Sequence, residues 1–268
     1  MSGVLEHRHA AGLHVVLDGP QATGRVPLVL LHGAGGSGRQ WRWVMEQLPS
    51  SVAPIAVDLP GHGDSIGPTS ASIVDAGVAV ANALDDLGVH PPVAVAAHSI
   101  GGLVGLALAG GIIPVSHLAL VCSAARITPH PGLIQALADP DAGEAFLRAG
   151  FSAEVPADRV EVVVQDIGRV RLADGGDYLG AARTDVVDLL PRVSAETLVV
   201  IADGDPVISP RKSRAMAGRI PLARTVVLSG GHYLHLERAT ALAGLLTELL
   251  AQPDAGRTSP SLLRSEAS

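Results

Sequence analysis

The 268-residue sequence predicts an α/β fold, with a mostly parallel, doubly wound sheet and an inserted helical cap. Short apolar runs recur along the chain, and most are continuous rather than alternating, which is typical of strands buried on both faces of a parallel sheet. Segments with helical periodicity separate these runs. The alternation stops between Arg126 and Arg192, where prolines interrupt short helical segments.

The regular elements follow from this alternation. Seven apolar runs are expected to form strands: Leu13–Leu17, Pro27–Leu31, Ala53–Val57, Val93–Ala97, Leu118–Cys122, Leu198–Ile201 and Thr225–Leu228. Five intervening segments are expected to form helices: Arg39–Leu48, Ile73–Leu87, Ile100–Ala109, Pro210–Arg219 and Ala239–Leu250. These elements assign residues 1–125 and 193–251 to one core domain.

Residues 126–192 are expected to form the helical cap. Leu133–Ala138 and Ala142–Ala149 have helical character, whereas Val160–Gln165 suits either a strand or a helix. The alternative interpretation is a set of ordinary crossover helices that belong to the core. Residues 252–268 combine Pro, Ser and Gly without periodicity, and we expect this tail to be disordered.

The composition excludes several classes of function. A net charge of −7 provides no basic surface for nucleic acid and no polybasic anchor for a membrane. No apolar stretch reaches the ~18 residues of a transmembrane helix, and residues 1–10 lack a signal-peptide core, so we expect a cytoplasmic protein. The single cysteine, Cys122, excludes an intrachain disulfide and a cysteine zinc cluster. We expect a monomer or a homodimer.

The strand expected at 93–97 leads directly into a serine that lies between small residues. Ala97 stands two positions before Ser99, and Gly101 stands two positions after it. A nucleophile on a strained strand-to-helix turn needs small side chains at both positions, and this arrangement is a nucleophile elbow. At the start of a helix, the serine hydroxyl would be exposed beside backbone N–H groups that face a developing oxyanion. We therefore predict that Ser99 is a nucleophile.

A glycine-rich loop, Gly33-Ala-Gly-Gly-Ser-Gly38, follows the strand expected at 27–31. A phosphate-binding loop is the alternative, but no Lys-Ser or Lys-Thr pair follows, and no acidic residue stands where a dinucleotide ribose would need it. The loop suits an oxyanion hole better. In it, the backbone N–H of Ala34 would act together with the backbone N–H of Ile100.

A serine nucleophile needs a base, and the base needs an orienting acid. His232 follows the last expected strand, and Asp205 follows the strand before it. The carboxyl ends of parallel strands meet at one edge of a sheet, so both residues can converge with Ser99. Asp203 is the alternative acid, but the proline after Asp205 should begin the next connection. His235 is the alternative base, but it lies at the apparent start of the last helix.

The segment Val57-Asp-Leu-Pro-Gly-His-Gly-Asp-Ser65 follows another expected strand. Its residues Asp58, His62 and Asp64 are conceivable metal ligands. A tight loop organised by hydrogen bonds from side chains to the backbone is the better interpretation. The sequence therefore predicts no metal site and no organic cofactor.

Five segments, in this order, resemble the α/β-hydrolase superfamily. They are LVLLHGAGGSG from Leu28, VDLPGHGDS from Val57, VAAHSIGG from Val95, LVVIADGDPVIS from Leu198 and LSGGHYLHLE from Leu228. The resemblance covers residues 10–125 and 195–250, and it is greatest to small bacterial hydrolases with a helical cap after the sixth strand. Ala97 and Ala202 stand where the family usually has glycine, and both are small.

The resemblance implies the catalytic triad Ser99, Asp205 and His232, with Ala34 and Ile100 as backbone donors to the oxyanion. The sequence thus predicts a serine hydrolase that cleaves an ester, lactone or thioester through an acyl-enzyme. Position 99 is a serine, not the aspartate nucleophile of haloalkane dehalogenases and epoxide hydrolases, so the chemistry of those enzymes is disfavoured. The alternatives are a C–C bond hydrolase or lyase with the same site, and a non-catalytic protein of this fold that binds a small molecule.

Aromatic residues are few and lie near the expected site. The sequence has two Trp, two Tyr and two Phe. Five of them are expected to line an apolar pocket for a small to medium hydrophobic substrate: Trp41, Phe146, Phe151, Tyr178 and Tyr233. The alternative is that they fill gaps in the core. Residues 126–192 carry more acidic than basic side chains, which disfavours polyanionic substrates such as acyl-CoA.

Overall fold

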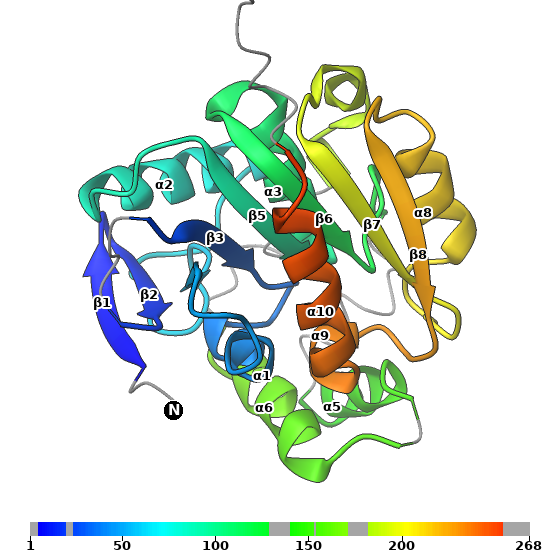
Figure 1. The fold of residues 1–268 in the computed structure, drawn as a ribbon. Helices are drawn as coiled ribbons and strands as arrows, with labels where there is room; N and C mark the ends of the chain where they lie inside the picture. The colour runs from blue at the N-terminus through cyan, green and yellow to red at the C-terminus, as the bar shows by residue number, and fades with distance from the viewer. Residues whose placement is uncertain (1–4, 20–23, 129–139, 153, 171–181, 254–268) are drawn as a thin grey trace, which may run out of the picture.

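The structure, a computed structural model, describes residues 5–19, 24–128, 140–152, 154–170 and 182–253. Its centre is an eight-stranded sheet with the order β1-β2-β4-β3-β5-β6-β7-β8 (Figure 1). The β1–β2 and β2–β4 pairs are antiparallel, and the other neighbours are parallel. The strands are β1 (Glu6–Ala10), β2 (Leu13–Leu17), β3 (Val26–Leu31), β4 (Val52–Val57), β5 (Val93–His98), β6 (Val115–Val121), β7 (Glu196–Ala202) and β8 (Ala223–Leu228).

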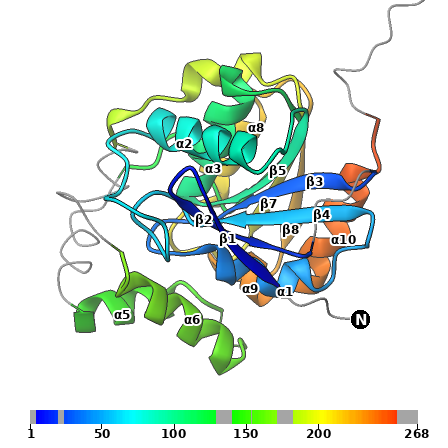
Figure 2. The same ribbon diagram turned by 90° about the vertical axis from the view of Figure 1, so that its left-hand side faces the viewer.

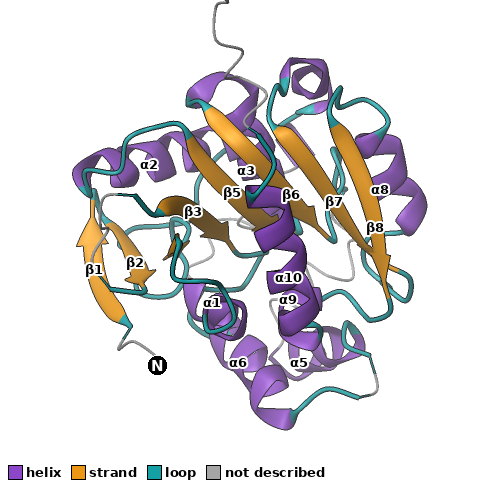
Figure 3. Cartoon of the chain, viewed as in Figure 1, coloured by secondary structure: helices purple, strands orange, loops and turns teal. Residues whose placement is uncertain are grey.

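Helices cover both faces of this sheet, as Figures 1 and 3 show. The α-helices are α1 (Arg42–Met45), α2 (Ile73–Asp86), α3 (Ile100–Ala107), α5 (Pro140–Ala149), α6 (Ala157–Ile167), α8 (Pro210–Ala217), α9 (Leu234–Glu237) and α10 (Ala239–Leu250). Two 3₁₀ helices, η1 (Gly38–Trp41) and η3 (Val187–Arg192), and the π-helix η2 (Leu108–Ile112) complete the described elements. Among the described residues, no helix is long and apolar enough to cross a membrane.

Side-chain alternation along the buried strands builds a core on each face of the sheet. In β3, Val29 and Leu31 pack into the cluster beneath α2 and α3, whereas Leu28 and Leu30 pack into the cluster beneath α1 and α10. Successive side chains of a strand point to opposite faces, so a strand covered on both sides must be apolar throughout. This explains the continuous apolar runs, and the predicted fold class is confirmed.

Three element predictions need correction. The edge strand β1 was missed because Glu6-His-Arg-His is polar, as a strand with few buried neighbours can be. The strand expected at Leu118–Cys122 begins at Val115, since Ser116 and His117 are buried polar residues within it, and it ends at Val121, since Cys122 has a positive φ of 47°. The helix expected at Arg39–Leu48 is divided into η1 and α1.

Two of the helices between β6 and β7, α5 and α6, lie beyond the carboxyl ends of the strands. Figures 1 and 2 both place α5 and α6 away from the two helical layers that cover the sheet. The ambiguous segment Val160–Gln165 is helical and belongs to α6. The helix expected at Leu133–Ala138 and the tail from residue 254 lie outside the described residues. The position of α5 and α6 sets them over the edge where strand-end loops meet.

Candidate active site

Ser99 occupies the turn between β5 and α3, as the elbow motif predicts. Its backbone has φ 53° and ψ −121°, a conformation that residues other than glycine seldom adopt. Two buried contacts hold the turn in place: the N–H of Ser99 donates to the carbonyl of Val121 (2.9 Å), and the Ser123 hydroxyl donates to the carbonyl of Ser99 (2.7 Å). The strained conformation directs the Ser99 hydroxyl toward His232.

Glycine is required at two positions around this turn. A Cβ atom at Gly101 would lie 2.3 Å from the carbonyl oxygen of His32, and a Cβ atom at Gly33 would lie 2.7 Å from Nδ1 of His98. Ala97 is tolerated in place of the usual glycine because Gly105 of α3 faces it. The elbow therefore packs directly against the glycine-rich loop after β3.

His232 lies between Ser99 and Asp205. Its Nε2 is 3.0 Å from the Ser99 Oγ, and its Nδ1 is 2.9 Å from Oδ2 of Asp205. The other carboxylate oxygen of Asp205 accepts hydrogen bonds from the N–H groups of Val207 (2.7 Å) and Ile208 (2.9 Å), which fix the carboxylate plane. Asp205 and His232 are buried. The structure thus brings together the three side chains that the sequence selected from separate strand-end loops.

The two alternative residues are engaged elsewhere. Asp203 is exposed, and its carboxylate accepts a hydrogen bond from the N–H of Gly230 (3.1 Å). His235 is fully buried behind the site, where its ring lies 4.9 Å from that of Trp41, and burial lowers its pKa to about 3. A histidine with so low a pKa is a poor proton acceptor, and the Nε2 of His235 lies 3.5 Å from the side-chain oxygen of Gln40.

The residue before Ser99 holds the loop of His232 in place, a role that the sequence did not reveal. His98 is buried, and its Nε2–H donates to the backbone carbonyl of His232 (2.8 Å). Complete burial, together with His235 and His232 nearby, holds the pKa of His98 well below its usual value. A neutral ring with its proton on Nε2 is the form that this contact requires. The only hint of this role in the sequence is that His98 directly precedes Ser99 in the segment VAAHSIGG.

A further contact ties the histidine loop to the segment after α5. The backbone N–H of His232 donates to the carbonyl of Gly150 (2.6 Å). The buried carboxylate of Glu237 accepts from the N–H groups of Gly231 (2.9 Å), Tyr233 (3.2 Å) and Ser152 (3.1 Å). Glu237 therefore joins the loop of His232 to the chain beyond α5, and nothing in the sequence pattern pointed to this residue.

A narrow cavity opens at Ser99 and His232. Its lining includes Ala34 of the glycine-rich loop, together with apolar side chains from α5 and α6: Phe146, Leu147, Val163 and Ile167. Tyr233 also lines it, and Phe151 stacks on the Tyr233 ring at 4.3 Å. Trp41 is fully buried in the core and is not among the described residues that line the cavity. Tyr178 lies outside the described residues.

A wider cavity of about 260 Å³ lies between the end of β6 and α8. Its lining is mostly apolar, with Leu190 and Met216 on the walls and Lys212 at the rim. Among the described residues that line it, none is a serine, a histidine or a carboxylate. The candidate active site is therefore the narrower cavity, because its described lining, unlike that of the wider one, includes a serine in contact with a histidine.

A buried carboxylate of α6 binds the end of the glycine-rich loop and the two residues after it. Asp166 accepts hydrogen bonds from the Ser37 hydroxyl (2.8 Å), Nε2 of Gln40 (2.8 Å) and Nε of Arg39 (2.6 Å). Burial raises the pKa of Asp166, while Arg39, Ser37 and Gln40 favour its ionised form. Asp166 thus connects α6 to the predicted oxyanion loop across more than a hundred residues of sequence.

The Asp166→Ala variant is expected to lose about 3 kcal/mol of unfolding free energy, because three donors are left without their acceptor. Urea unfolding monitored by circular dichroism measures the loss. Asp158→Ala is the matched control, since Asp158 is an exposed residue of the same helix. Equal stability of the two variants would contradict a structural role for Asp166.

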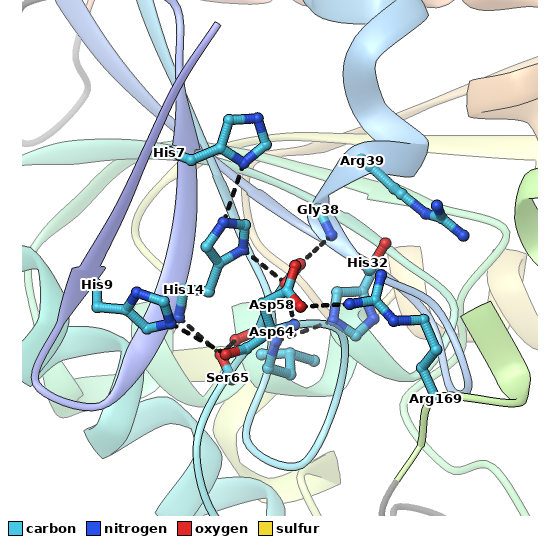
Figure 4. Close-up of polar contacts among 12 residues, drawn as sticks. His7, His9, His14, His32, Gly38, Arg39, Asp58, Asp64, Ser65 and Arg169 are labelled. Atoms are coloured by element: carbon cyan, nitrogen blue, oxygen red, sulfur yellow. Dashed lines mark hydrogen bonds and ion pairs between the residues drawn. The ribbon is translucent and has the colours of Figure 1, made fainter. Parts of the chain in front are cut away.

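The loop at 57–65 is organised by Asp58 (Figure 4). The Asp58 carboxylate accepts from the N–H groups of Gly38 (2.6 Å) and Asp64 (2.9 Å) and contacts Nδ1 of His14 (2.7 Å). Burial opposes ionisation, but His14 and the backbone donors outweigh it, so the pKa of Asp58 lies below its usual value. His62 contacts the carbonyl of Pro60 (3.0 Å) instead. The predicted bonding from side chain to backbone is confirmed.

Known proteins share this fold. Residues 28–245 match the Alpha/beta hydrolase family. The pimeloyl-(acyl-carrier protein) methyl ester esterase of Neisseria meningitidis serogroup A is 30% identical over 240 residues, which cover 82% of this chain and 75% of that protein. The enol-lactonase from Burkholderia xenovorans LB400 has a TM-score of 0.80 at 23% identity, covering 92% of this chain and 100% of that one. A thermophilic esterase from Thermogutta terrifontis has a TM-score of 0.73 at 23% identity, covering 91% and 98%. This chain belongs to the α/β hydrolase family.

Proposed function

We propose that the chain is a serine hydrolase that cleaves a carboxylic ester-type bond, with Ser99 as nucleophile, His232 as base and Asp205 as the orienting acid. The observation that supports this most is the continuous series of contacts from the Ser99 Oγ to His232 (3.0 Å) and from His232 to Asp205 (2.9 Å). A serine, a histidine and a carboxylate in this order form the apparatus of acyl transfer.

In the first half-reaction, Nε2 of His232 accepts the hydroxyl proton as the Ser99 Oγ attacks the substrate carbonyl. The backbone N–H groups of Ala34 and Ile100 stabilise the oxyanion, and the helix N-terminus at α3 adds favourable charge. His232 then gives its proton to the departing alcohol, which leaves an acyl-enzyme. In the second half-reaction, His232 activates a water that releases the acid and restores Ser99. Asp205 keeps the proton of the neutral imidazole on Nδ1 throughout.

The cavity lining supports a hydrophobic substrate of small to medium size. We infer that residues 126–192 form a cap, because α5 and α6 supply Phe146, Leu147, Val163 and Ile167 to the wall opposite Ser99. The relatives support an ester-type bond in particular, since their names describe a methyl ester esterase and an enol-lactonase. An apolar wall recognises an acyl chain or an apolar alcohol through burial of its surface.

A fluorophosphonate probe tests the proposal directly, because it reacts covalently with an activated serine. The expected result is one labelled peptide that contains Ser99, together with hydrolysis of p-nitrophenyl esters in a panel of graded chain length. Labelling at Ser99 without hydrolysis of any ester would favour C–C bond cleavage at the same site. No labelling and no hydrolysis would favour a non-catalytic binding protein.

A further inference from the structure

The wider cavity, between the end of β6 and α8, has apolar walls and a cationic rim. Leu190 and Met216 belong to its walls and are almost fully buried. Arg126, Lys212 and Arg219 also line the cavity, and all three are exposed. We propose that this cavity binds a small carboxylate with an apolar chain, which packs against the walls while the carboxylate group meets the rim.

The rim carries an excess of positive charge. Arg126 pairs with Asp185, which is exposed and does not line the cavity. Among the described residues, neither Lys212 nor Arg219 forms an ion pair. No carboxylate belongs to the described lining. An anionic group at the rim therefore meets two cationic side chains that no described carboxylate neutralises, and a charge-assisted hydrogen bond to either one is favourable.

The sequence around α8 has the same sign of charge as the rim. Residues 206–236 contain five Lys and Arg and no Asp or Glu, whereas the whole chain has 19 Lys and Arg against 26 Asp and Glu. The segment that supplies Lys212 and Arg219 is thus basic within an acidic protein. A local field of one sign raises the concentration of ligands of the opposite sign. The charge distribution therefore favours an anion in this cavity over a neutral or a cationic ligand.

The volume of the cavity limits the ligand to a short chain. At about 260 Å³, the cavity is smaller than most pockets for drug-sized ligands, which have roughly 300–1,000 Å³. An apolar cavity of about 150 Å³ holds benzene, so on the same scale 260 Å³ accommodates about ten non-hydrogen atoms. Octanoate has this size. Its chain would leave water as it packs against the apolar walls, which is the main favourable contribution from such a lining.

The wider cavity is separate from the candidate active site. The described linings of the two cavities have no residue in common. Figures 1 and 2 both place α8 apart from α5 and α6, which line the narrower cavity. A carboxylate in the wider cavity would therefore leave the position beside Ser99 open, and its binding does not depend on the proposed hydrolysis.

The methionines of the chain make it possible to locate the ligand by NMR spectroscopy. Met216 lines the cavity, whereas Met45 is buried in the core cluster beneath α1 and α10. In protein labelled with carbon-13 at the methionine methyl groups, octanoate is expected to shift the Met216 resonance and to leave that of Met45 unchanged. The Met216→Leu variant assigns the resonance. Octan-1-ol, which lacks the charge, should bind at least ~10-fold more weakly. Acetate, which lacks the chain, should give no shift at the same concentration.

Lys212→Glu is expected to weaken octanoate binding at least ~10-fold, because it replaces a cationic partner by a like charge. Arg214→Glu is the matched control, since Arg214 is an exposed residue of the same helix that does not line the cavity, and it should bind as the wild type does. Both side chains are exposed, so both variants are expected to fold, and circular dichroism verifies this. Three results would each overturn the proposal: an unshifted Met216 resonance, equal affinity for octanoate and octan-1-ol, or wild-type affinity in Lys212→Glu.

Discussion

The Ser99→Ala variant is expected to lose ester hydrolysis by several orders of magnitude, up to ~10⁶ in kcat. In the proposed mechanism this hydroxyl attacks the carbonyl, and its Oγ lies 3.0 Å from Nε2 of His232. The fold should persist, because the contacts that hold the elbow use the backbone N–H and carbonyl of Ser99. Steady-state kinetics on the best p-nitrophenyl ester, together with a thermal unfolding curve, measure both effects.

Ser229→Ala is the matched control for this variant. Ser229 is an exposed serine just after β8, on the loop that carries His232. It should retain turnover close to that of the wild type, and the fluorophosphonate probe should still label Ser99. Alanine has no hydroxyl that could carry an acyl group. Wild-type turnover in Ser99→Ala would therefore contradict the proposed mechanism, which needs an acyl-enzyme at this position.

The Asp205→Asn variant is expected to lower kcat by about 10⁴. Asparagine is nearly isosteric, so the hydrogen bonds from Val207 and Ile208 can be kept. Its amide group, however, can donate to Nδ1 and thereby favour the tautomer with the proton on Nε2. In that tautomer His232 cannot accept a proton from Ser99. Single-turnover acylation at pH 8 measures the loss in the step that needs the base.

Asp203→Asn is the matched control for the acid. Asp203 precedes Asp205 by two residues, but its exposed carboxylate binds the N–H of Gly230. An asparagine oxygen can keep this contact, so only a minor change in kcat is expected. A large loss in Asp203→Asn with little loss in Asp205→Asn would reassign the acid to Asp203.

The sequence by itself determined which three side chains form the centre of the candidate site. Continuous apolar runs revealed the buried strands β5 and β7, a β-prone segment revealed the edge strand β8, and the residue types just beyond their ends selected Ser99, Asp205 and His232. Convergence could be predicted without coordinates because the carboxyl ends of parallel strands share one edge. These features are local, since burial on both faces of a strand is recorded in every one of its residues.

Only the tertiary structure decided which buried polar groups are paired. The contacts of His98 with the carbonyl of His232, of Asp166 with Ser37, and of Gly150 with His232 join residues that are 82 to 134 positions apart. The β1 strand depends on pairing with β2 rather than on hydrophobic periodicity. Periodicity reports how deeply a residue is buried within its own element. The partner of a buried donor or acceptor is set by the packing of distant elements, where each such group must find a hydrogen bond.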